Sequence, residues 1–266
     1  MISPKKYLNM KSVIIILASV FSLSFLSNNV LAEKNELVKM SQDLLKKVKA
    51  KKSTKTLEES IKNLDKKRLF KELKTDQEKI AFWVNIYNAY IQIKLNNNPA
   101  LYEKRGKFFS MDQVDIAGEV LSFEKIEHGF IRRSQKPAGL GYVRKWFPGR
   151  LERKLRVDEI DYRIHFALNC GAKSCPPVGI YSAENLDKEL AYMTKTYLKN
   201  NTDYDKKSNT VKSTTLFSWF RGDFGGLSGV KDILKEQGLI PTTDVDLKFK
   251  DYDWTLLTNQ FVDIKA

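Results

Sequence analysis

One predicted helix constrains the fold of this chain more than any other segment. Thr75 and Glu78 have the spacing of a capping box, and the helix that follows runs from about Asp76 to Leu95, where Asn-Asn-Asn-Pro at 96–99 ends it. Apolar residues cover most of its circumference instead of one stripe: Ile80, Trp83, Val84, Tyr87, Tyr90, Ile91 and Leu95. Such a helix is buried on several sides. We therefore expect the other elements to pack around it.

Three carboxamides interrupt the apolar surface of this helix. Asn85, Asn88 and Gln92 stand at i, i+3 and i+7, so they form one stripe along it. Buried amides need hydrogen-bond partners. The stripe therefore either belongs to a functional site or bonds loop backbone that crosses the helix, and the sequence leaves both interpretations open.

Helical and alternating patterns divide the rest of the chain. The segment 33–73 predicts two amphipathic helices, and Ser122–Arg133 predicts another, with Glu124, His128 and Arg132 stacked at i, i+4 and i+8. A further helix is predicted near 183–198, and a shorter one near 230–237. Alternation at 161–169 predicts a strand with His165 and Asn169 on one face, and a similar pattern recurs at Val245, Leu247 and Phe249.

These patterns predict an α+β fold. We expect a single mixed domain with a helix-rich N-terminal half and a small sheet in the C-terminal half that carries His165 at its centre. No Gly/Ser-rich or Pro-rich linker divides the chain, and we find no internal repeat. The segment 33–266 is accordingly predicted to be one domain.

The first 32 residues have the layout of a secretory signal peptide. Lysines precede an apolar run at 13–26, and Val30 and Ala32 are small residues of the kind that signal peptidase reads before a cut. The apolar run is short for a retained anchor. We predict cleavage after Ala32, a periplasmic or secreted product, and no membrane span in the mature chain.

The chain is basic, with 46 Lys and Arg against 32 Asp and Glu and a formal net charge of +14. Its lysine pairs at 46–47 and 51–52 lie on polar helical faces without interleaved aromatics, so a solvated lysine-rich surface is the simpler interpretation. Export leaves an anionic envelope polymer or a small ligand as the expected partner class, and nucleic acid is not expected. No phosphate loop or dinucleotide fingerprint appears, so no cofactor is predicted.

Five separated segments resemble one protein family. They are Ala81–Ala89 (AFWVNIYNA), Ile126–Arg132 (IEHGFIR), His165–Pro176 (HFALNCGAKSCP), Trp219–Gly226 (WFRGDFGG) and Tyr252–Trp254 (YDW). Together they span about residues 76–257, and in this order they resemble the domain of unknown function 547 family. Five matches in order are far more specific than one short motif. The resemblance implies export and a set of site residues, and it implies no established reaction.

Two histidines and two cysteines are the candidate chemical groups, and three of the four fall within 164–176. In one interpretation, Cys170 or Cys175 is a thiolate nucleophile and His165 or His128 is its base. Asn85 or Asn88 would then orient the imidazole or bind an oxyanion. This set predicts a Cys/His-dependent envelope hydrolase or acyl transferase.

Two other interpretations of the same residues stay open. An even cysteine count in an exported chain favours a Cys170–Cys175 disulfide, which fits a noncatalytic envelope binding or structural module. A tetrahedral zinc site from both histidines and both cysteines is the third, although the cysteine spacing is longer than usual for zinc.

Polar residues from separate segments satisfy one another most readily when they converge. We therefore predict that His165, His128, Asn85, Asn88 and the loop 170–175 line one polar pocket in an apolar core. Two aspartates are ambiguous. Asp223 either caps the following helix or orients a histidine, and Asp253 presents the same choice.

Overall fold

Helix α5 (Asp76–Asn97) is central, as its all-round apolar surface predicts. A computed structural model describes residues 35–265 of the chain, so the predicted signal segment and its cleavage site lie outside the described residues. Every α5 residue from Lys79 to Gln92 is buried. The predicted capping box is present, because the Thr75 side chain accepts from the Glu78 amide and the Glu78 side chain accepts from the Thr75 amide.

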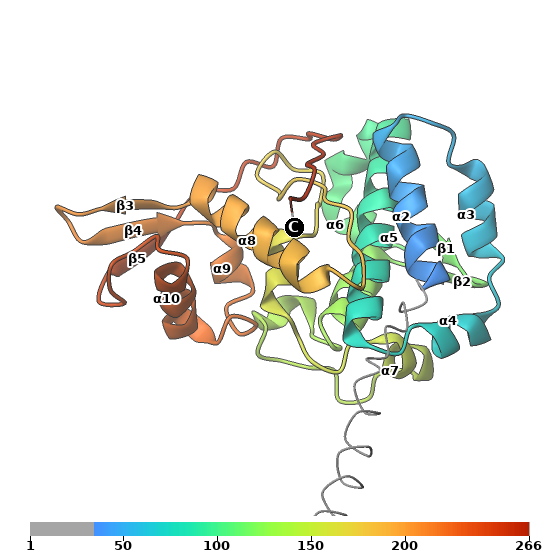
Figure 1. The fold of residues 1–266 in the computed structure, drawn as a ribbon, viewed down its shortest axis with the longest axis horizontal. Helices are drawn as coiled ribbons and strands as arrows, with labels where there is room; N and C mark the ends of the chain where they lie inside the picture. Colours follow the sequence, from blue (N-terminus) through green and yellow to red (C-terminus); the bar gives the residue numbers. More distant parts are fainter. Residues whose placement is uncertain (1–34, 266) are drawn as a thin grey trace, which may run out of the picture. The chain divides into compact units, whose positions relative to one another are not determined.

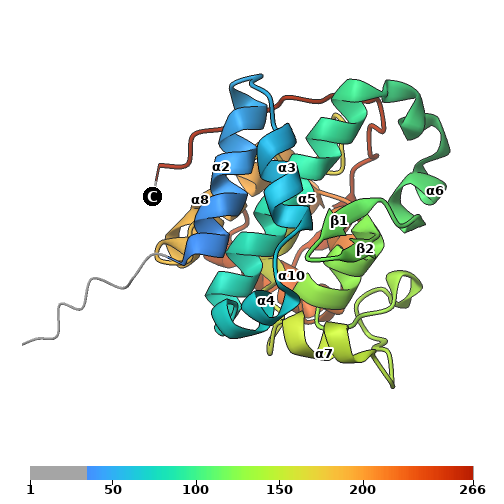
Figure 2. The ribbon, with the colours of Figure 1, turned by 90° about the vertical axis from the view of Figure 1, so that its right-hand side faces the viewer.

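Between residue 35, where the described part of the chain begins, and α5 there are three helices, not the predicted two. They are α2 (Glu36–Lys49), α3 (Lys55–Lys62) and α4 (Lys66–Glu72). Asp65 separates α3 from α4, because its side chain accepts from the Lys67 amide and caps a new helix. Helix α2 packs along α5, and Figure 2 shows α3 beside α2.

The described chain continues after α5 through short elements. In chain order these are η1 (Pro99–Lys104), α6 (Arg105–Ser110), β1 (Val114–Ile116), β2 (Glu119–Leu121), η2 (Lys125–Ile131), η3 (Pro137–Gly139), α7 (Arg150–Leu155), η4 (Tyr162–Phe166), α8 (Leu186–Asn201), β3 (Asp203–Asp205), β4 (Thr210–Ser213), α9 (Leu216–Trp219), α10 (Gly226–Glu236) and β5 (Asp246–Phe249). Figure 1 shows β3, β4, β5 and α10 together, away from α2 and α3. Within residues 35–265, no helix is both long enough and apolar enough to cross a bilayer.

The fold is α+β, as predicted, and the described residues form two small sheets. Strands β1 and β2 form an antiparallel hairpin. Strand β4 pairs antiparallel with β3 and parallel with β5, where Val211 lies opposite Leu247. The alternation at 245–249 therefore does correspond to a strand.

The predicted strand at 161–169 is wrong, and so is the expected place of His165 at the centre of a sheet. This segment forms the 3₁₀ helix η4, which packs beside α8. The Asp161 side chain accepts from the Arg163 amide, and the Ala167 and Leu168 amides donate to the Ile164 carbonyl, so the backbone is satisfied locally. Residues 164–169 are all buried, so the alternation of residue types in this segment does not correspond to alternating buried and exposed faces.

The predicted helix at 122–133 forms with a different hydrogen-bond period. Its middle, η2, is a π-helix, and the Arg132 amide donates to the Glu127 carbonyl at 2.8 Å, five residues back. A π-turn inserts one residue into a helix and is frequent at functional sites. Here it carries both Glu127 and His128.

Candidate functional site

A cavity of about 390 Å³ opens where α5, η2, η4, α9 and the C-terminal segment meet. Its walls are mainly aromatic and aliphatic. The lining side chains are Tyr87, Phe109, Glu124, Glu127, His128, Pro137, Leu140, His165, Leu168, Cys170, Pro176, Leu216, Trp219, Phe220, Tyr252 and Trp254. An apolar pocket with a few convergent polar groups is the form that ligand sites usually take.

His165 is held by Asp223 at this cavity. The imidazole Nε2 lies 2.8 Å from Asp223 Oδ2, and the ring stacks on Phe220 with centroids 4.1 Å apart. Burial lowers the pKa of His165 below its usual value, although the bond to Asp223 acts in the opposite direction. The imidazole is therefore neutral at pH 7, it donates from Nε2, and Nδ1 is the unprotonated nitrogen.

Arg132 joins the two histidines through the same carboxylate. Its Nε donates to Asp223 Oδ2 at 2.6 Å, and its Nη1 lies 2.6 Å from His128 Nδ1. A guanidinium only donates, so His128 Nδ1 accepts and the proton of that ring is on Nε2. Burial lowers the pKa of His128, and the charge of Arg132 adds to this effect. His128 is thus a neutral ring with a donor at Nε2.

Asp223 stays ionised although its side chain is fully buried. Burial raises its pKa, but the hydrogen bonds from His165 and Arg132 outweigh this and hold the pKa below the ordinary 3.8. The pair Arg132–Asp223 is therefore a buried ion pair, flanked by two neutral imidazoles. Buried charges with perturbed pKa values beside a cavity are characteristic of functional sites.

Close backbone packing places Asp223. The Gly222 amide donates to the Leu140 carbonyl at 2.8 Å, and a Cβ at Gly222 would lie 2.4 Å from the Gly141 carbonyl carbon. A Cβ at Gly141 would in turn lie 2.6 Å from the Asp223 amide, and Gly141 has φ +84°. Only glycines permit these two turns to touch, which explains a Gly-rich sequence before and around Asp223.

Two glutamates, Glu124 and Glu127, line the cavity together with His128. Tyr87 donates to Glu127 Oε2 at 3.2 Å, and Glu127 Oε1 lies 3.7 Å from His128 Nδ1. Burial, followed by the charge of Glu127, raises the pKa of Glu124 above its usual value. The cavity that His128 lines therefore contains a carboxyl group, Glu124, that holds its proton more readily than an ordinary glutamate.

The carboxamide stripe of α5 bonds crossing backbone and does not line the cavity. Asn88 donates to the Ala167 carbonyl at 2.9 Å and accepts from the Asn169 amide at 2.8 Å. Asn85 donates to the Tyr181 carbonyl and accepts from the Tyr181 amide. The predicted direct roles of Asn85 and Asn88 at an imidazole or oxyanion thus have no supporting contact. Their contacts hold the segments that follow η4.

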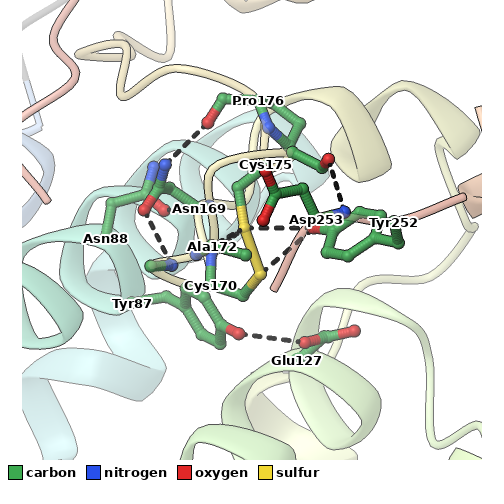
Figure 3. The surroundings of a disulfide bond; sticks show 12 residues. Tyr87, Asn88, Glu127, Asn169, Cys170, Ala172, Cys175, Pro176, Tyr252 and Asp253 are labelled. Atoms are coloured by element: carbon green, nitrogen blue, oxygen red, sulfur yellow. Dashed lines mark hydrogen bonds between the residues drawn. A yellow bond between two sulfur atoms is a disulfide. The ribbon is translucent and has the colours of Figure 1, made fainter. Parts of the chain in front are cut away.

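Cys170 and Cys175 form a disulfide (Figure 3). Cys170 lines the cavity with both histidines, but its sulfur is bonded to that of Cys175. Neither cysteine is a free thiol, so the predicted thiolate nucleophile is absent from this state of the protein. Within residues 35–265 no three His, Cys, Asp or Glu side chains are grouped to hold a metal, so the four proposed zinc ligands are not assembled.

Residues 70–198 match the family model described as protein of unknown function, DUF547. The chain belongs to this family. The matched segment includes α5, η2, η4 and the disulfide loop, and it stops before Asp223 and Tyr252. No curated protein and no solved structure gave a match.

Three groups of this site were missed or left undecided by sequence reasoning, and two of them lie beyond the segment that matches DUF547. Arg132 was noted only as a helix position, Asp223 was ambiguous, and Tyr252 was named only within a motif. The sequence carried a signal for each, because Arg132 follows His128 by four residues and the other two lie in the family-like segments 219–226 and 252–254. Their contacts with one another depend on the fold.

Proposed function

We propose that this protein is a hydrolase in which His165 and His128 act on a small substrate in the aromatic cavity and water is the nucleophile. The observation that carries the proposal is the network in which Arg132–Asp223 fixes the proton positions of both rings. His165 presents an unprotonated Nδ1, which is suited to a general base. His128 presents a protonated Nε2, which is suited to an oxyanion donor.

The bond changes follow from these proton positions. A water oxygen attacks an acyl carbon while His165 Nδ1 takes its proton, and Asp223 stabilises the imidazolium that forms. The oxyanion accepts from His128 Nε2–H. When the tetrahedral intermediate breaks down, His165 returns the proton to the leaving group.

Water is favoured because the other hydroxyls at the cavity are poor nucleophiles. Among the lining residues, the hydroxyl groups are the phenols of Tyr87 and Tyr252. Burial raises the pKa of both, so both stay protonated at neutral pH. The disulfide removes Cys170 from this role, so a covalent acyl transfer is less well supported than hydrolysis.

Hydrolysis of p-nitrophenyl esters of graded acyl length tests the proposal. We expect His165→Gln to lower kcat/KM by about 10²- to 10⁴-fold and His128→Gln by about 10²- to 10³-fold. The control Asp187→Asn, at an exposed ion pair, should leave the rate within about twofold. Iodoacetamide should not inhibit the oxidised protein, and inhibition would instead support a cysteine nucleophile.

A noncatalytic binding module is the second candidate, favoured by the mainly aromatic lining of the cavity. Its ligand would be a small ring-containing molecule, because the aromatic side chains of Trp219, Tyr252 and Trp254 line the cavity. Quenching of tryptophan fluorescence by ligands, with no turnover of any ester in the panel, would support this candidate against the hydrolase.

We also propose that the protein is exported to the periplasm or beyond. A cut after Ala32 would leave Asn35 two residues inside the new terminus, where its side chain caps α2 by accepting from the Leu37 and Val38 amides. Export would bring the basic chain close to anionic envelope polymers, and it would provide an oxidising compartment for the disulfide.

A further inference from the structure

The two sulfurs of the disulfide have unequal surroundings. Cys175 Sγ accepts from the Cys170 amide at 3.1 Å, the Ala172 amide at 3.3 Å and the Tyr252 hydroxyl at 3.1 Å. Cys170 Sγ has only the Tyr252 hydroxyl, at 3.3 Å. Figure 3 shows this phenol beside both sulfurs. Hydrogen-bond donors stabilise a thiolate, so the arrangement favours negative charge on Cys175.

The two cysteines also differ in access. Cys170 is half-buried and lines the 390 Å³ cavity, whereas Cys175 is buried with 5% of its surface exposed. Cys175 borders a different surface pocket, beside Lys173 and Asp253. A small molecule in the cavity therefore meets Cys170.

The loop between the cysteines is held by bonds that do not require the disulfide. Asn169 donates to the Pro176 carbonyl at 2.7 Å (Figure 3). It also accepts from the Gly171 amide at 3.0 Å, which ties the two ends of the loop together. The Cys175 amide donates to the Ala172 carbonyl, and the Leu257 amide to the Gly171 carbonyl. Gln92 on α5 donates to Asn169 Oδ1 at 3.0 Å and fixes this clamp to the core. Opening the disulfide would leave the sulfurs near each other.

We propose that Cys170–Cys175 is a thiol-exchange centre whose substrates are low-molecular-weight thiols that enter the cavity. The thiolate of the substrate attacks Cys170 Sγ, an S–S bond forms between them, and the Cys170–Cys175 bond breaks with its electron pair on Cys175. Cys175 is the better leaving group because its thiolate is stabilised by three donors. A second thiol attacks the substrate sulfur of the mixed disulfide and releases Cys170. Two substrate thiols are thereby oxidised to one disulfide, and the protein gains two thiols.

This activity is separate from the proposed hydrolysis, because it requires no histidine and no acyl substrate. A thiol-exchange centre differs from a structural disulfide in one measurable respect. A structural pair resists reduction until the protein unfolds, whereas an exchange centre reacts in the folded state.

Reduction of the native protein by dithiothreitol, followed by iodoacetamide labelling and mass spectrometry, tests reactivity without any variant. We expect both cysteines to be labelled while the circular dichroism spectrum stays native. A disulfide that opens only when urea unfolds the chain would overturn the proposal. Ester hydrolysis measured in the same samples reports on the hydrolase separately.

Thiolate absorbance at 240 nm, followed against pH in the reduced protein, tests the asymmetry. We expect one thiol to titrate below the usual value of about 8.5 and to disappear in Cys175→Ser. Tyr252→Phe should raise that pKa by about one unit, because it removes one donor to the thiolate. The matched control Tyr204→Phe, whose hydroxyl bonds Asn209, should leave it unchanged. Two ordinary thiols near 8.5 would refute the assignment.

Single-cysteine variants test which sulfur a reagent in the cavity reaches. With 5,5′-dithiobis(2-nitrobenzoate) as the probe, the protein thiolate attacks the reagent, so rates are compared at a pH above both thiol pKa values. Cys175→Ser should then form a mixed disulfide at Cys170 at least about tenfold faster than Cys170→Ser forms one at Cys175. A faster reaction at Cys175 would mean that exchange proceeds from the pocket beside Lys173, and it would contradict entry through the cavity.

Discussion

His165 Nε2 lies 2.8 Å from Asp223 Oδ2, although the two residues are 58 positions apart in the chain. The same oxygen accepts from Arg132 Nε at 2.6 Å. One carboxylate oxygen thereby joins Arg132, directly after η2, to His165 of η4 and to the turn before α10. The carboxylate sets the proton of His165 on Nε2, and the bond from Arg132 Nη1 sets that of His128.

The buried carboxylate should be essential for stability. Asp223→Asn removes the negative charge and leaves Arg132 buried without a counter-charge, so we expect unfolding in urea to show a loss of about 3–5 kcal/mol. Asp187→Asn is the matched control, because Asp187 pairs with Arg163 at the surface and should contribute about 1 kcal/mol or less. Similar small losses in both variants would contradict the buried ion pair.

The free energy of unfolding should rise as the pH increases toward 6.5, because the two buried histidines resist protonation in the folded state. Burial lowers the pKa of His165 and His128 below the unfolded value of 6.5, so the unfolded chain binds more protons between the two values. Their contribution is therefore complete above pH 6.5 and is lost as the pH falls below it. Urea midpoints from pH 5 to 8 measure this.

The pH dependence of the wild type contains an opposing contribution. The raised pKa of Glu124 stabilises the fold at low pH and loses that effect as the pH rises. The difference between the wild type and His165→Gln removes this background, and we expect the variant to have the flatter profile. Parallel profiles would show that His165 does not titrate differently on unfolding.

Backbone contact between two turns should make Gly222 intolerant of a side chain. In Gly222→Ala the new Cβ meets the Gly141 carbonyl carbon at 2.4 Å, so we expect a loss of about 1–3 kcal/mol in urea unfolding. Gly106→Ala in α6 is the control, because nothing lies within 4 Å of its Cβ, and it should be neutral or stabilising. Equal effects would mean that the two turns can separate freely.

The carboxamides of α5 should contribute more to stability than to any reaction. Asn85→Ala or Asn88→Ala each leaves one backbone amide and one carbonyl buried without a partner, which we expect to cost about 2–4 kcal/mol. Asn96→Ala is the control, because Asn96 is exposed and bonds Asn259; it should lower the free energy of unfolding by less than about 1 kcal/mol. Differential scanning calorimetry ranks the three variants.

Export predicts a defined N-terminus. Intact-mass measurement of the protein from the periplasm or culture medium should give a chain that begins at Glu33. A product that retains the first 32 residues would contradict cleavage, and an intact chain in the cytoplasm would contradict export.

The central helix and its cap were predictable because they depend on local spacing. Thr75 and Glu78 form a capping box from residues three apart, and the apolar surface of 80–95 needs no knowledge of its neighbours. The helix-rich first half and the strand at 246–249 followed from periodicity in the same way. Periodicity failed at 161–169, because residues 164–169 are all buried and leave no exposed face to reveal a period.

The amino-acid sequence by itself determined which polar groups must be accommodated: two histidines, two cysteines and three carboxamides among apolar residues. Only the tertiary structure decided their partners. It brought the Asn88 side chain into hydrogen bonding with the Ala167 carbonyl and joined Cys170 to Cys175. It also brought Asp223 to His165, and the reason is physical: a buried polar group must be satisfied, but a partner 58 residues away is supplied by the packing of distant elements and leaves no local pattern.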